Sequence, residues 1–190
     1  RISYAGRADR GPKPASEDEV VEVPVVMPGL WDCHGHFLGM ESADLERLAL
    51  TSVVQTTARA TADAARTLMG GVTSVRDVGG NGLQLAAAID EGAVPGPHIH
   101  GAGAILSTTG GHADVHSLPL DWVHQIEGIG GLGIICDGIP EVLRAVRTNL
   151  RANARLIKIC ASGGVVSEVD HPIHQQFSDD ELRAIVGEAT

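Results

Sequence analysis

The fold is decided by the stretch VTSVRD at residues 72–77, which is followed by GGNG at residues 79–82 and LQLAAAIDE at residues 83–91. The first segment reads as an apolar strand, the second as a tight turn and the third as a helix that ends at Gly92. Strands connected through helices pair in parallel, because the crossover returns the chain to the same end of the sheet. This unit therefore predicts an α/β protein with a parallel sheet.

Similar units flank this stretch on both sides. The expected strands cover residues 25–33, 98–104 and 156–161, and the expected helices cover residues 56–69, 140–152 and 178–190. Four strand–helix units fit either a doubly wound sheet or half of a (β/α)8 barrel of TIM type, which needs eight units and about 250 residues. Because no stop signal follows the last helix, we expect the chain to be truncated.

Residues 1–24 differ from the rest of the chain. They read as one or two short strands around a polar loop that contains proline, and we interpret them as the remnant of a small β-domain. Residues 25–190 then hold the first four strand–helix units of the main domain.

Composition excludes several classes of partner. The net charge of −10 argues against nucleic acid or an anionic membrane, and no apolar stretch approaches the roughly 20 residues that span a bilayer. Cys33, Cys136 and Cys160 form no pair motif, so we expect free, buried thiols in a reducing compartment, the cytoplasm. Because the sequence starts inside a strand-like segment, an N-terminal segment could be missing, and secretion stays an alternative to the cytoplasm.

The first expected strand ends in a His-x-His pattern. Side chains alternate along a strand, so Asp32, His34 and His36 should share one face. Two imidazoles about 7 Å apart on that face can converge on one metal ion. Taken alone, however, the pattern more often marks two ordinary histidines at a strand end.

Lys158 lies between two isoleucines in the fourth expected strand. Burial disfavours an ammonium ion and favours the neutral amine. A neutral amine reacts with carbon dioxide to give a carbamate, whose two oxygens suit two metal ions. The alternative is a lysine that extends to the rim of the sheet or pairs with an acid.

The long connection over residues 105–138 is a candidate substrate loop. In it, Gly110 and Gly111 precede His112, which could meet a substrate carboxylate or carbonyl, whereas we expect His116 and His124 in solvent. The run at residues 128–133 matches G-x-G-x-x-G, but it does not join a strand directly to a helix, so we interpret it as a chance match.

Four motifs occur in one order: PGLWDCHGH at residues 28–36, GVTSVRD at 71–77, LSTTGGH at 106–112 and IKICASGG at 157–164. In this the chain resembles the amidohydrolase superfamily, in its imidazolonepropionase-like and Xaa-Pro dipeptidase-like branch. The resemblance implies the N-terminal half of a (β/α)8 barrel beside the remnant of a small β-sandwich. It also implies two divalent metal ions, usually zinc.

The resemblance assigns roles to individual residues. His34 and His36 would bind the first metal ion, and carbamylated Lys158 would bridge both ions around a metal-activated hydroxide that attacks the scissile carbonyl. His112 and Gly111 would lie near the substrate. We expect Asp32 and Asp77 to contact and orient the metal ligands without binding a metal ion themselves. For Asp77 the alternative is an ion pair.

The family pattern also needs two histidines from strands five and six and an aspartate from strand eight. This sequence ends before those strands, and we do not assign their roles to His171 and His174, which follow the fourth strand and should be solvated. The missing ligands would come from residues beyond Thr190 or from another chain, so the expected partner is the rest of the barrel or a second copy.

The expected activity is hydrolysis of the amide bond in an N-acyl amino acid or dipeptide. A cyclic-amide hydrolase of the imidazolonepropionase type is the first alternative, and a non-catalytic half-barrel subunit is the second. Neither the particular substrate nor the metal follows from the sequence, because specificity in barrels rests on later loops.

Overall fold

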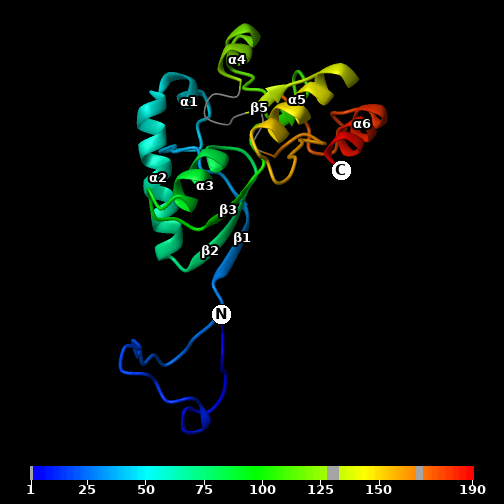
Figure 1. Cartoon of the computed structure of the whole chain (residues 1–190). Coiled ribbons are helices and arrows are strands. Elements are labelled where there is room, and N and C mark those ends of the chain that lie inside the picture. The colour runs from blue at the N-terminus through cyan, green and yellow to red at the C-terminus, as the bar shows by residue number, and fades with distance from the viewer. Residues whose placement is uncertain (1, 128–132, 166–168) are drawn as a thin grey trace.

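The computed structural model describes residues 2–127, 133–165 and 169–190 (Figure 1). Its helices are α1 (Glu46–Leu50), α2 (Val53–Met69), α3 (Gly82–Asp90), α4 (Leu120–Ile126), α5 (Ile139–Arg151) and α6 (Asp179–Ala189), with one 3-10 turn, η1 (Ala8–Arg10). No helix within the described ranges is long and apolar enough to cross a membrane.

Two parallel sheets organise the fold, as the strand–helix pattern predicts. One has the order β1-β2-β3, from β1 (Leu30–Gly35), β2 (Val72–Asp77) and β3 (His98–Gly101). The other pairs β4 (Ile105–Ser107) with β5 (Gly133–Ile135). The bounds of β2 are those predicted from the sequence.

The first strand begins later than expected. Residue 25 was its predicted start, but β1 begins at Leu30, which lies opposite Val72 at the start of β2. Before that point the chain has no neighbouring strand to supply hydrogen bonds, and residues 2–29 run away from the body as an almost fully exposed arm (Figure 1). The short strands expected in this arm do not form, and η1 is its one regular turn within the described residues.

The third predicted strand is shorter than expected, because β3 ends at Gly101, and a separate strand, β4, begins at Ile105, beyond the predicted end at residue 104. Gly103 adopts a φ of +74° between β3 and β4, and a Cβ there would lie 2.7 Å from Oδ1 of Asn149. The Asn149 amide accepts a hydrogen bond from the Ala104 nitrogen and donates one to its carbonyl oxygen. This bend moves the chain from the first sheet to the second, and residues 105–138 accordingly contain β4, α4 and β5 rather than one long loop.

The fourth predicted strand pairs at a single position. Ile159 forms a parallel bridge with Leu106, whose nitrogen donates to the Lys158 carbonyl and whose carbonyl accepts from Cys160, both at 2.9 Å. Lys158 therefore lies beside β4, although the segment is too short to count as a strand. The glycine-rich match covers residues 128–133. Residues 128–132 lie outside the described residues, and Gly133 is the first residue of β5.

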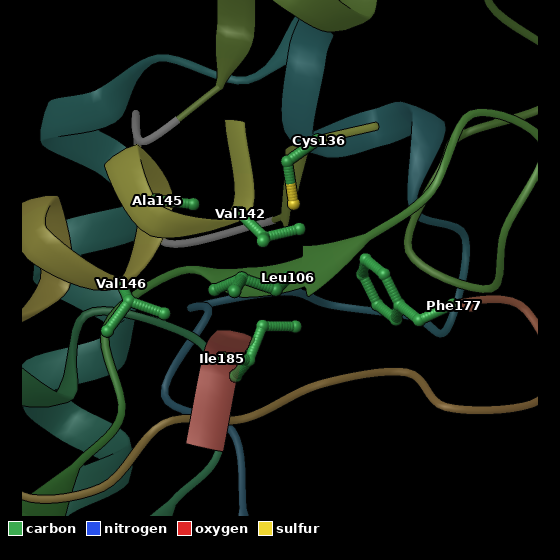
Figure 2. Packing of buried hydrophobic residues seen from close by; sticks show 7 residues of the cluster. All are labelled: Leu106, Cys136, Val142, Ala145, Val146, Phe177 and Ile185. Atoms are coloured by element: carbon green, nitrogen blue, oxygen red, sulfur yellow. The ribbon is translucent and has the colours of Figure 1, made fainter. Parts of the chain in front are cut away.

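Two apolar clusters hold the helices on the sheets. Ala60 and Ala64 of α2 and Leu85 of α3 pack with Val75 of β2 and Phe37 in the first. The second joins β4, α5 and α6 (Figure 2), and its members are Leu106, Cys136, Val142, Ala145, Val146, Phe177 and Ile185. Burial of these side chains is the main stabilising contribution to the fold.

The cysteines match the sequence prediction in part. All three are free, and Cys136 and Cys160 are buried, but Cys33 is exposed because it lies on β1 at the open edge of its sheet. Burial raises the pKa of the Cys136 thiol to about 12, so it stays protonated as a core residue.

Candidate active site

His34 and His36 lie side by side at the carboxyl end of β1. Their ring centroids are 5.2 Å apart in an edge-on arrangement, and both side chains are exposed. The pairing of β1 with β2 is irregular between Asp32 and Gly35, where three steps along β1 match two along β2. The regular alternation assumed from the sequence is therefore interrupted, yet the two imidazoles still meet.

A long-range hydrogen bond fixes the ring of His36. Its Nδ1 lies 2.8 Å from the carbonyl oxygen of Gly79. A carbonyl only accepts, so Nδ1 carries the hydrogen and Nε2 keeps its lone pair. This is the tautomer that a metal-binding histidine needs when Nε2 is the donor atom.

Asp77 supports the hydrogen bond between His36 and Gly79 through contacts with the backbone. It is fully buried, and its carboxylate accepts hydrogen bonds from the Phe37 nitrogen at 2.9 Å and the Gly79 nitrogen at 3.4 Å. It thus holds both the residue after His36 and the residue that His36 contacts. Burial raises the pKa of Asp77, and the hydrogen bonds to its carboxylate partly oppose this.

Lys158 lies close enough to act on His34. The pKa of His34 is below its ordinary value of 6.5, first because of partial desolvation and next because of the positive charge of Lys158, with smaller effects of His36 and Arg76. Asp32 opposes this shift, and its Oδ1 accepts a hydrogen bond from the His34 nitrogen at 2.9 Å. A lowered pKa favours the neutral imidazole, which is the form that binds metals.

Lys158 itself is half-buried between the second sheet and solvent. The sequence predicted a neutral amine on the basis of burial, and this stays a prediction. The charge of Lys158 acts on His34, whose ring adjoins that of His36, and the Gly79 carbonyl links His36 to Asp77.

His112 follows a turn at the end of the second sheet. Gly110 has a φ of +71°, and the Gly111 nitrogen donates to the Thr108 carbonyl at 2.9 Å, so the glycines close the turn before the histidine. The half-buried His112 ring packs on Gly164, in the loop after Lys158. Thus the substrate-loop histidine and the lysine segment are joined.

Two residues at this position were missed from the sequence. Asp170 and Gln176 contact His112 and each other. Nothing in their local sequence marks them, because single polar residues in a loop are common. Gln176 also lies 64 positions away from its partner, His112.

The other histidines differ in their surroundings. His116, expected in solvent, is half-buried, with Nε2 3.0 Å from the Gly111 carbonyl, whereas the exposed His124 lies 2.8 Å from Glu127. His171 and His174 are exposed as predicted, although their rings adjoin at 5.0 Å. Among the described residues, no ring contact joins any of these four histidines to His34 or His36.

The donor set fits part of a metal centre. Within residues 2–127, 133–165 and 169–190 no group of three or more His, Cys, Asp or Glu side chains could hold an ion. His34 and His36 nevertheless offer two adjacent imidazoles, one of them locked in the suitable tautomer, with Lys158 as the third nearby group.

Parallel strands connected by helices define the general class, an α/β protein, and the candidate side chains His34 and His36 lie at the carboxyl end of β1. Residues 25–190 match the sequence profile of the Amidohydrolase family, and the chain belongs to this family. This confirms the resemblance carried by the four sequence motifs.

Known relatives agree with this assignment. The chain is 40% identical to ochratoxinase of Aspergillus niger in an alignment of 201 positions that covers 99% of this chain and 42% of the relative. The crystal structure of A. niger ochratoxinase superposes with a TM-score of 0.80 at 41% identity, covering 86% of this chain and 40% of that one.

A prolidase complexed with N-methylphosphonate-L-proline gives a TM-score of 0.77 at 39% identity, and a Xaa-Pro dipeptidase with bound methionine gives 0.70 at 34% identity. They cover 86% and 85% of this chain, and the chain covers 40% of each of them. The chain thus spans less than half the length of the relatives it matches.

Proposed function

We propose that the protein hydrolyses the amide bond between an acyl group and an amino acid, as in an N-acyl amino acid or a dipeptide. The observation that carries this proposal is the imidazole pair of His34 and His36 beside Lys158. The relatives add support, because those at 34–41% identity include an ochratoxinase, a prolidase and a Xaa-Pro dipeptidase.

The proposal includes two divalent metal ions, with zinc as the expected metal. His34 and His36 would hold the first ion, and Lys158 would bridge both after carbamylation. When bound, such ions polarise the amide carbonyl and lower the pKa of water. The remaining ligands would come from the rest of a (β/α)8 barrel or from a second copy.

The residues of this chain have separate tasks in this proposal. The Gly79 carbonyl and Asp77 keep Nε2 of His36 available, and partial desolvation of His34 favours its neutral form. The neutral amine of Lys158 attacks carbon dioxide to form an N–C bond and releases a proton. His112 would contact the substrate.

Lys158 can be tested without an activity assay, because the chain has one other lysine, Lys13, in the exposed arm. With 13C-labelled bicarbonate, NMR should show a carbamate signal that Lys158→Ala removes and Lys13→Ala keeps. Added zinc should strengthen this signal. A signal that survives in Lys158→Ala would contradict the assignment.

The reaction itself is tested by metal analysis and a panel of N-acyl amino acids, dipeptides and ring amides. We expect activity on the first two classes, lost in Lys158→Ala and retained in Lys13→Ala. Preference for ring amides would favour the imidazolonepropionase type instead, and normal activity of Lys158→Ala would refute the mechanism.

A further inference from the structure

Three residues hold His112, Gly164 and Asp170 at its ring and Gln176 at its backbone, and we name them the His112 clamp. The Asp170 side chain is only 5% exposed, and its Oδ2 lies 3.8 Å from Nδ1 of His112. The same oxygen accepts hydrogen bonds from the Gly164 nitrogen at 2.8 Å and from Nε2 of Gln176 at 3.0 Å. Two donors thus hold one carboxylate oxygen beside the imidazole.

The clamp also holds the backbone of the histidine. Oε1 of Gln176 accepts a hydrogen bond from the His112 nitrogen at 3.1 Å, so a single amide joins His112 to Asp170. The turn after β4 is thereby tied to the loop that follows Lys158. A side chain held at both its backbone and its ring loses most of its freedom to reorient.

Gly164 provides the space for the ring. A Cβ at this position would lie 1.8 Å from Cε1 and 1.9 Å from Nδ1 of His112, which is far inside van der Waals contact. The imidazole therefore rests directly on the backbone of the lysine-bearing loop. Only glycine allows this approach.

We infer that Asp170 is a positioning residue for His112. A negative charge beside Nδ1 favours the tautomer with the hydrogen on Nδ1, in which Nε2 is the acceptor. The same charge would stabilise the ring when it takes up a proton or donates to a substrate oxygen. This inference rests on the proposed function in one respect, namely that His112 meets the substrate.

The substitution Asp170→Asn separates charge from structure. Its amide oxygen can accept the same two hydrogen bonds from Gly164 and Gln176, but it carries no negative charge. Asp170→Ala removes both the charge and the acceptor. Asp180→Asn is the matched control, because Asp180 is an exposed carboxylate on α6 that pairs with Arg183.

The first readout is the tautomer of His112, measured by long-range 1H–15N NMR on the 15N-labelled chain and assigned with a His112→Asn variant. We expect mainly the Nδ1–H form, shifted toward Nε2–H in Asp170→Asn and unchanged in Asp180→Asn. An unchanged tautomer in Asp170→Asn would overturn the inference. If Asp170→Asn does not fold, Gly164→Ala serves in its place, because the added methyl moves the ring away from the carboxylate and should shift the tautomer likewise.

The second readout is kinetic. Asp170→Asn should lower kcat/KM for an N-acyl amino acid by about 10- to 100-fold, the usual effect of losing an outer-shell partner, with metal content and unfolding temperature unchanged. A purely structural role would instead lower the unfolding temperature and leave the kinetics of the folded fraction intact. If the unsubstituted protein hydrolyses no amide, the proposed function fails, whereas the NMR result still decides the role of Asp170.

Discussion

At the residue scale, the orientation of His36 depends on groups far away in sequence. The Gly79 carbonyl that holds its ring is 43 positions away, and Asp77 in turn holds Gly79 and Phe37. This network is the reason that an exposed imidazole keeps one tautomer. Asp77 therefore positions the backbone groups on which the orientation of His36 depends.

Removal of the Asp77 carboxylate should destabilise the fold. In Asp77→Ala the buried nitrogens of Phe37 and Gly79 lose their acceptor, and each unsatisfied donor costs about 1–3 kcal/mol. We expect the free energy of unfolding in urea to fall by about 2 kcal/mol or more. Asp90→Ala, an exposed carboxylate at the end of α3, is the control, and equal stability of the two variants would contradict this account.

At the element scale, local signals at the start of a helix formed the structure that they indicate. Residues 178–181 have the sequence of a capping box, and the box forms at the start of α6, with the Glu181 nitrogen donating to Ser178 Oγ and the Ser178 nitrogen donating to Glu181 Oε2. Pro140, a residue type suited to the first turn of a helix, lies in the first turn of α5. By contrast, residues 156–161 have the composition of a strand but pair at one position, because strand formation depends on a neighbour.

The capping box should make stability depend on pH. Hydrogen bonds from the Ser178 side chain and from the Ser178 and Gly138 nitrogens lower the pKa of Glu181 below its ordinary value of 4.5. A lowered folded-state pKa stabilises the protein above about pH 4.5, and this contribution is lost as the pH falls through the lower, folded-state value.

Glu181→Gln tests this expectation. Unfolding in urea should show the unsubstituted chain to be more stable than Glu181→Gln at pH 7, with the difference shrinking below about pH 4.5. Asp121→Asn on α4 controls for general loss of an acidic residue. A difference that stays constant down to pH 3 would refute the assignment to Glu181.

At the scale of the whole molecule, helices cover one face of the first sheet. α2 and α3 pack on the face that carries Val75 and Ile99, while Arg76 and His100 on the other face are exposed. Helices on both faces are typical of a doubly wound sheet, whereas a barrel turns its helix-free face inward. The one-sided packing within the described residues therefore favours the barrel interpretation.

The exposed face should drive association of the isolated chain. Trp31 is 57% exposed and stacks on His100 at 5.1 Å, on an edge strand that offers unpaired backbone groups. Sedimentation should therefore detect dimers or larger species, and Trp31→Lys should weaken association at least about tenfold. Trp122→Lys, which changes the exposed tryptophan of α4, should have little effect. A chain that stays monomeric at all concentrations would contradict this prediction.

The sequence by itself determined the parallel α/β class, β2, the capping box of α6 and the family, because these depend on patterns within a few residues of each other. It also singled out His34, His36 and Lys158 by residue type and spacing. Only the tertiary structure decided where β1 begins, where β3 ends and β4 begins, and which side chains surround His112. Those features depend on contacts between segments more than 40 positions apart, such as His36 with Gly79 and His112 with Gln176, and no local pattern records them.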